Sequence, residues 1–286
     1  MNKNAYMKRT IGLLPLLLIS LGGCTANKTD TFYIKEYDNK DKYEYGNRYF
    51  YADEEIKEIY INWIFGNVNI SCSDTETAIF INETADLRDD LRMISYSEEG
   101  TLYVRYLSCG EHEGNIIEKD LEVTIPRTFD IEKIQCNSYD VDINVEANAK
   151  KYYMYCEKGN VNLLCDKVDY VYFSSKSAKV SLIANEIDYV HTDSTKANFE
   201  FRFKTFNLIK MFNDFGDFDL ILEGEVFPYG VYYHTENGAF ASDLHYVKGD
   251  DGVLCFNGTT FTSRVYSYVL NGNFGLSQFW NMKHIK

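Results

Sequence analysis

A short sequence phrase recurs at nearly constant spacing between Phe129 and Leu244, and this repeat limits what the chain can fold into. In each copy, apolar residues alternate with polar ones around a central anchor. The copies are SYDVDINV, KGNVNLLC, SAKVSLIA, KANFEFRF, FGDFDLIL and the weaker NGAFASDL, with anchors Val141, Val161, Val180, Phe199, Phe218 and Phe240. This nearly constant period predicts an all-β fold, a single-stranded parallel β-solenoid (β-helix-like) of about 19–20-residue coils.

Aligning the copies on their anchors sorts the remaining residues into columns. The columns twelve before, seven before and two after the anchor are mostly apolar and are predicted to point inward. Small residues predominate two before the anchor, where a tight corner favours them. That column reads Tyr139, Gly159, Ala178, Ala197, Gly216 and Gly238. Like residues would then lie above like at a spacing of about 4.8 Å.

The composition agrees with strands and excludes some partners. Aromatic residues make up 16% of the chain, with 24 Tyr, and there are only three Pro. Aromatic side chains suit a half-buried pleated surface. The formal net charge of −14 argues against nucleic acid, because phosphate binding needs clustered Lys and Arg. It also argues against an electrostatic membrane patch.

The first 23 residues read as a targeting segment. Lys3, Lys8 and Arg9 form a positive region, and Ile11 to Leu21 is apolar but short for a bilayer span. The following Leu-Gly-Gly-Cys, which ends at Cys24, resembles the lipobox of bacterial lipoproteins. The resemblance implies cleavage before Cys24 and acylation of its thiol, including palmitate, which would hold the chain in the membrane of the bacterial cell envelope, outside the cytoplasm. The mature charge would then be −17.

The domain plan follows from these signals. Residues 1–23 are the predicted lipoprotein signal peptide, and residues 24–54 the lipidated Cys and a polar tether. Residues 55–286 are the predicted β-solenoid domain, with an N-terminal cap coil at Glu55 to Cys72 and a C-terminal cap. Because an open solenoid end is a template for aggregation, we expect the bulky residues from Gln278 to Met282 to close the C-terminal end, after a last coil at Gly272 to Leu276.

The order of parts resembles a bacterial "putative adhesin" β-strand-repeat lipoprotein family of unknown function. The shared parts are GNVNI at Gly66 to Ile70, TLYV at Thr101 to Val104, LEVTIP at Leu121 to Pro126, and the repeated coils up to Leu220. The resemblance covers about residues 55–276. It departs from the family where the repeat Gly is replaced by Tyr139, Ala178 and Ala197. It implies a structural scaffold and brings no catalytic residues.

Cysteine and acidic side chains offer two candidate sites. Cys136 and Cys156 share the column five before the anchor, so adjacent coils could bring them within disulfide range; the alternative is two buried free thiols. No Cys or His spacing suggests zinc, and the acidic turn with Asp214, Asp217 and Asp219 lacks the spacing of known calcium loops. We therefore expect no metal and no cofactor.

Two outward columns, eight and ten before the anchor, form a tyrosine ridge on an acidic body. The ridge comprises Tyr153, Tyr170, Tyr172, Tyr189, His191, Lys210 and Tyr232. Tyr side chains can stack on sugars or grip a peptide. The alternative is an aromatic ladder that only stabilises the sheet.

The sequence thus predicts a cell-surface lipoprotein, a non-catalytic scaffold for adhesion or envelope interaction. Its partners would be the membrane, through Cys24, and a cell-envelope glycan or protein. One alternative is an envelope-stress or signalling accessory that binds a membrane protein. Another is a β-helix enzyme acting on a polysaccharide, for which Asp193, His234 and Lys210 are the one set of side chains that can be assembled.

Overall fold

The chain is nearly all β. The computed structural model describes residues 44–84, 92–106, 117–223, 230–248, 254–256 and 263–279. Within these ranges there is no α-helix, only the short 3-10 turn η3 (Ala52–Glu54), and the strands form a sixteen-stranded open sheet. No helix in this part of the chain is long and apolar enough to cross a membrane.

The strands have the following bounds. They are β1 (Glu44–Tyr45), β2 (Arg48–Tyr51), β3 (Glu58–Ser73), β4 (Ala78–Glu83), β5 (Ile94–Glu98), β6 (Thr101–Arg105), β7 (Leu121–Pro126), β8 (Lys133–Glu146), β9 (Lys151–Phe215), β10 (Phe218–Glu223), β11 (Gly230–His234), β12 (Phe240–Ser242), β13 (Tyr246–Lys248), β14 (Leu254–Phe256), β15 (Arg264–Asn271) and β16 (Phe274–Phe279).

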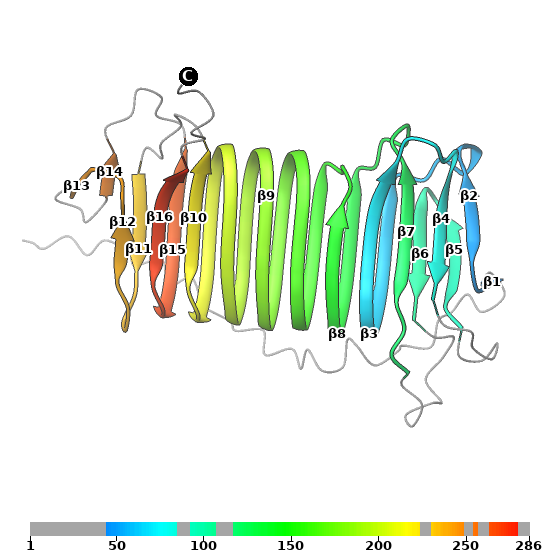
Figure 1. Cartoon of the computed structure of the whole chain (residues 1–286), viewed down its shortest axis with the longest axis horizontal. Coiled ribbons are helices and arrows are strands. Elements are labelled where there is room, and N and C mark those ends of the chain that lie inside the picture. The colour runs from blue at the N-terminus through cyan, green and yellow to red at the C-terminus, as the bar shows by residue number, and fades with distance from the viewer. Residues whose placement is uncertain are drawn as a thin grey trace, which may run out of the picture.

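The repeat forms parallel neighbours about one period apart. Where β9 follows β8, Ile143 lies opposite Val161, and the adjacent Asn162 amide donates to Asn144 at 2.8 Å. Where β10 follows β9, the predicted anchors Phe199 and Phe218 lie opposite each other. Between these two points β9 winds through successive turns along the long axis of the molecule (Figure 1).

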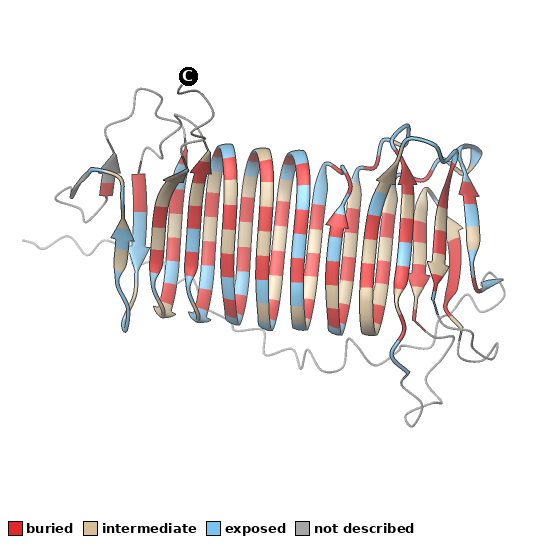
Figure 2. Cartoon of the chain, viewed as in Figure 1, coloured by how far each residue is buried: buried red, intermediate tan, exposed pale blue. Residues whose placement is uncertain are grey.

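Buried and exposed side chains alternate along these turns (Figure 2). The buried set forms one continuous hydrophobic core, as the period of two in the sequence predicts. Phe201 and Phe218 are fully buried on adjacent turns, with ring centroids 5.3 Å apart. Burying each such ring stabilises the fold by about 1.5–3 kcal/mol, so the inward columns hold the stack together.

The corner column contains glycine where the backbone requires it. Gly159 has φ +121°, and a Cβ there would lie 2.1 Å from the carbonyl oxygen of Val141 on the neighbouring turn. Ala178 and Ala197, one and two repeats later, are not among the described residues with positive φ. The corner therefore has two backbone forms, and the Ala replacements occur where no left-handed backbone is needed.

The phase of the first copy of the repeat differs from the predicted one. Ile143, not Val141, occupies the anchor position, because Ile143 lies opposite both Val68 and Val161. The spacing between the first two anchors is thus two residues shorter than predicted. A shift of two positions keeps the same side chains facing inward, so the alternation alone could not choose between the two phases.

The stacking order at the C-terminal end also differs from the chain order. Phe274 of β16 lies between Phe218 of β10 and Phe240 of β12, and pairs with both in parallel. Likewise β15 lies between β9 and β11. The coil that comes last in the sequence therefore lies between two earlier coils in the stack. Gln278 and Phe279 pair with β10 inside the stack instead of closing its end. Residues 280–282 lie outside the described ranges.

The N-terminal end shows the same kind of rearrangement. β3, the predicted first coil, has β8 on one side and the later strands β6 and β7 on the other, all in parallel. Antiparallel strands then extend the sheet: β5 and β4 pair with β6 and β7, and β1 and β2 pair with β5 and β4. Residues 44–54, predicted to be part of the tether, therefore belong to the folded sheet. Their short, irregular strands have no period that the sequence could reveal.

Candidate functional site

The tyrosine ridge lies on one outward face of the parallel strands. Its residues alternate with fully buried neighbours such as Tyr152, Val171 and Val190. The ridge side chains are half-buried or exposed. The predicted outward orientation is thus present in β9 and β11.

Ridge residues on successive turns are in contact. The ring of Tyr153 is 5.4 Å from that of Tyr170, which is 5.3 Å from Tyr189. Tyr172 and His191 are 5.3 Å apart, and the Lys210 ammonium lies 5.7 Å from the centre of the Tyr189 ring. The structure therefore brings these residues of β9 together in one surface.

The surface continues through residues that sequence reasoning missed. Tyr266 of β15 lies between Lys210 and Tyr232, with its ring stacked on Tyr232 at 4.7 Å. The next outward column adds Tyr155, Phe212, Tyr268 and His234. The aromatic band is the ridge together with these five residues.

A signal for the missing part was present. The stretch Val265-Tyr-Ser-Tyr-Val269 alternates like Val171-Tyr-Phe, but it lies outside the six repeat copies. Its place in the middle of the band follows from the inserted coil, which the period could not show.

The band is long and partly accessible. From Tyr153 to Tyr232 it crosses six neighbouring strands, about 24 Å at the usual strand spacing. Phe212 is 42% exposed and Tyr268 46%, and their parallel rings are 5.4 Å apart. Stacked rings that retain this much exposure leave a flat apolar surface available to a ligand.

The band contains few charges near neutral pH. Burial lowers the pKa of His191, partly offset by Asp193, while Lys210 lowers it further. Burial also raises the pKa of Tyr170 to about 12, with neighbouring tyrosines adding to the effect. The imidazole and the phenol are therefore neutral at pH 7, and Lys210 contributes the positive charge.

The two candidate disulfide cysteines are not in register. Cys136 lies opposite Met154, and Cys156 lies opposite Ser138, because the spacing between the first two anchors is two residues shorter than predicted. Both are buried free thiols, which is the alternative to the disulfide that the sequence left open. Burial raises the pKa of Cys136 above its ordinary value and that of Cys156 to about 11, which keeps both thiols protonated at neutral pH.

The side chains assembled for an enzyme do not form one site. Asp193 and Lys210 both lie close enough to His191 to shift its pKa. His234 lies farther away, because the strand segments that contain Phe212 and Tyr268 separate it from Asp193. Three strand spacings amount to about 14 Å, too far for a shared proton.

In the acidic turn, burial raises the pKa of Asp219, with Asp217 contributing. No group of His, Cys, Asp or Glu in the described ranges is placed to hold a metal ion.

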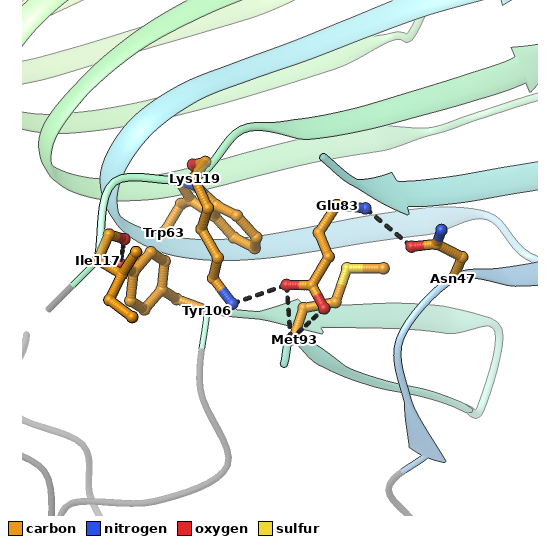
Figure 3. A network of polar contacts seen from close by, with 7 residues as sticks. All are labelled: Asn47, Trp63, Glu83, Met93, Tyr106, Ile117 and Lys119. Atoms are coloured by element: carbon orange, nitrogen blue, oxygen red, sulfur yellow. Dashed lines mark hydrogen bonds and ion pairs between the residues drawn. The ribbon is translucent and has the colours of Figure 1, made fainter. Parts of the chain in front are cut away.

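A buried polar network, which no sequence pattern indicated, lies at the N-terminal end (Figure 3). The Lys119 ammonium is 2.8 Å from a Glu83 carboxylate oxygen, and the two side chains are 0% and 3% exposed. The carboxylate also accepts hydrogen bonds from the Met93 backbone N–H at 2.9 and 3.0 Å. Desolvation lowers the pKa of Lys119, and Glu83 partly opposes this shift.

Aromatic rings complete this network. The Lys119 ammonium lies 4.5 Å from the centre of the Tyr106 ring and 5.2 Å from that of Trp63. The Trp63 indole N–H donates to the Lys119 carbonyl at 2.9 Å, and the Tyr106 hydroxyl donates to the Ile117 carbonyl. These contacts join β3, β4, the residue that follows β6 and the segment before β7. Because the network is enclosed, we assign it to fold stability and not to ligand binding.

The predicted lipidation site, Cys24, lies outside the described residues, as does the signal peptide.

Comparisons with known proteins give a general likeness. No family model matches the sequence, and no curated protein matches it. A solved "putative cell adhesion protein" from Clostridium sporogenes is 8% identical, with a TM-score of 0.34 over 83% of this chain and 100% of that chain. A "putative adhesin" from Bacteroides fragilis is 12% identical, with a TM-score of 0.39 over 86% and 100%.

A third solved structure has a different name. It is a "putative lipid binding protein" from Parabacteroides distasonis, 12% identical, with a TM-score of 0.29 over 84% of this chain and 97% of that chain. The adhesin names are consistent with the family that the sequence resembles. At these identities and TM-scores the likeness assigns no function to this chain.

Proposed function

We propose that this protein is a lipid-anchored, non-catalytic β-solenoid that binds a cell-envelope ligand through its aromatic band. The observation that carries the proposal is the continuity of the band: outward rings on six neighbouring strands, in contact with one another and partly exposed. The adhesion role, the anchor and the ligand are parts of this one proposal.

The exposure of the band supports binding over a purely structural ladder. Rings that only stabilise a sheet face gain most from mutual coverage. Phe212, Tyr232 and Tyr268 keep 37–46% of their surface exposed, and leaving large apolar surface in water has a free-energy cost. An extended ligand that covers these rings would recover that cost.

The position of the folded N-terminus supports a lipid anchor. Glu44, the first described residue, is in β1 at one end of the long axis, and the stack continues away from it (Figure 1). The segment from Cys24 to Glu44 can span at most about 70 Å. A chain acylated at Cys24 would thus be attached at the end of the stack and present the band on its side.

The overall charge favours an uncharged ligand. The chain carries a formal −14, so anionic polymers would be repelled, while the band, apart from Lys210, offers uncharged ring faces and hydroxyls. Sugar rings, which present an apolar face and hydroxyl edges, fit such a surface. We therefore propose an envelope glycan as the ligand. A single membrane-protein partner is the signalling alternative.

The test compares two pairs of stacked surface rings in the full-length protein. Phe212→Ala with Tyr268→Ala removes a stacked pair from the band. Tyr49→Ala with Phe80→Ala removes a stacked pair of the N-terminal end, whose rings are 4.4 Å apart. We expect the band variant to lose retention on purified cell-envelope polysaccharide, while the control retains it.

Melting temperatures of all three proteins show whether either variant is unfolded. Retention of the band variant equal to that of the unchanged protein would refute the proposal. The unchanged protein could instead fail to retain polysaccharide and crosslink to one membrane protein, with this crosslink lost in the band variant. That result would replace the glycan with the protein partner. Release of oligosaccharides from the polysaccharide would contradict the non-catalytic part.

A further inference from the structure

A hollow opens on the outer face directly beside the aromatic band. Its volume is about 400 Å³, within the usual range of small-ligand sites. The side chains that matter here are Asn137, Tyr155, Glu157, Ser174, Lys176 and Asp193. Tyr155 belongs to both the band and the hollow, and its ring is 5.4 Å from that of Tyr172.

One small residue explains why the surface is hollowed at this point. The outward column that contains Asn137 and Tyr155 carries large rings again at Phe212 and Tyr268. Between Tyr155 and Phe212, on successive turns, it carries Ser174 and then Asp193. Because serine is much smaller than tyrosine, Ser174 leaves space beside the half-buried ring of Tyr155, and both residues line the hollow.

The lining offers both acceptors and donors of hydrogen bonds. Asp193 is exposed, and its carboxylate interacts electrostatically with Tyr172 and His191, so its oxygens can accept hydrogen bonds from a ligand. Lys176 is paired with Glu157, whose side chain is 14% exposed against 44% for Lys176. The Asn137 amide donates to the Tyr60 hydroxyl and accepts from Gln135 at 3.4 Å, which fixes its orientation.

The charge balance indicates which ligand fits. Two carboxylates and one ammonium line the hollow, and the ammonium is already paired with one of the carboxylates. A carboxylate or phosphate on the ligand would meet Asp193 unopposed, whereas hydroxyl groups would donate to it. The apolar face of a sugar ring would lie against Tyr155.

We infer that this hollow binds one uncharged pyranose unit of the glycan, with Asp193 accepting from vicinal hydroxyls and Tyr155 stacking on the ring. The inference rests on the proposed function in one respect: the rest of the glycan would continue along the aromatic band. The hollow then sets the preference for neutral sugars, and the band supplies length-dependent affinity.

The test uses the full-length protein and two sets of neutral oligosaccharides, disaccharides and hexasaccharides built from hexose or N-acetylhexosamine, with hexuronic acid disaccharides as the charged comparison. Ser174→Tyr fills the hollow with a side chain that the same column carries at Tyr155 and Tyr268. The matched control is Ser181→Tyr, an outward serine between the buried Val180 and Leu182 beyond the corner. Asp193→Asn keeps the shape and removes the charge.

Disaccharides decide the inference, because they can occupy the hollow without reaching across the band. We expect neutral disaccharide affinity, measured by calorimetry, to fall about 10-fold or more in Ser174→Tyr and in Asp193→Asn, as expected for a lost hydrogen bond to a charged group. Ser181→Tyr should bind like the unchanged protein. Asp193→Asn provides the answer if Ser174→Tyr fails to fold.

The two proposals fail separately. If no neutral disaccharide binds, if both hollow variants bind like the unchanged protein, or if hexuronic acids are preferred, the inference is wrong. If disaccharides bind as expected but Phe212→Ala with Tyr268→Ala leaves hexasaccharide affinity and polysaccharide retention unchanged, the hollow stands and the role of the band is refuted.

Discussion

Replacing Glu83 with Gln should expose how much the fold depends on the buried network of Figure 3. The substitution keeps the shape of the side chain but removes the counter-charge of Lys119, 2.8 Å away. Breaking a buried ion pair from one side typically destabilises a protein by about 3–5 kcal/mol. The Trp63 and Tyr106 rings remain beside the ammonium, and each contributes about 0.5–2 kcal/mol.

An upper limit follows from protonation, because Lys119 can escape the penalty by losing its proton. Its ordinary pKa is 10.5, and desolvation already lowers it in the fold. Holding it neutral at pH 7 therefore costs at most about 5 kcal/mol, at about 1.4 kcal/mol for each pH unit. We expect the variant to be about 3–5 kcal/mol less stable than the unchanged protein at pH 7.

The pH dependence has a definite sign. Glu83 raises the pKa of Lys119 in the unchanged protein and so opposes desolvation, and its loss should lower that pKa further. At any pH between this lowered pKa and 10.5, the folded variant binds fewer protons at Lys119 than the unfolded chain does. The free energy of unfolding then rises with pH. The stability gap to the unchanged protein should narrow by up to about 2.7 kcal/mol between pH 7 and pH 9.

The assay is urea unfolding followed by the fluorescence of Trp63, which lies in the network itself. Trp280, the second tryptophan, is replaced by Phe in every protein compared. Lys119→Met is the control, because it lacks the titrating group and its gap should not narrow between pH 7 and pH 9. The reasoning would be refuted if Glu83→Gln lowered the free energy of unfolding by less than about 1 kcal/mol, as is typical of a surface pair. It would also be refuted if the loss of stability were the same at both pH values.

The remaining predictions concern the corner, the thiols and the band. Gly159→Ala should lower the free energy of unfolding by about 2–4 kcal/mol, because it adds backbone strain and a contact 2.1 Å from the Val141 carbonyl oxygen. Ala178→Gly should cost only about 0.5–1 kcal/mol, and equal costs in urea unfolding would contradict the two corner forms. The buried thiols of Cys136, Cys156 and Cys165 should resist iodoacetamide at pH 8 until the protein is unfolded, because burial raises each pKa, that of Cys165 to about 12; peptide mapping that finds a Cys136–Cys156 disulfide would overturn the register. In an ultraviolet titration, Tyr170→Phe should remove a phenol that ionises near pH 12 instead of 10, and loss of a phenol titrating near pH 10 would speak against its burial within the band.

The alternation of the sequence was enough to predict the outward face. Tyr153, Tyr172 and His191 lie where the repeat placed them because a strand has a period of two, and like residues gather on one face whatever the overall topology. The same reasoning predicted the parallel stacking of the middle copies, in which the anchors Phe199 and Phe218 lie opposite each other.

Long-range pairing decided the rest. A shift of two positions leaves inward side chains inward, so only the pairing of Ile143 with Val68 and Val161 fixed the first phase and separated Cys136 from Cys156. The insertion of β15 placed Tyr266 between Lys210 and Tyr232, a neighbourhood that chain order hides. Lys119 and Glu83 are far apart in the sequence, and their burial depends on which strands flank β3. A local period records which way side chains point, whereas the neighbours of each strand depend on free energies of contacts distant in the sequence, and these only the tertiary structure shows.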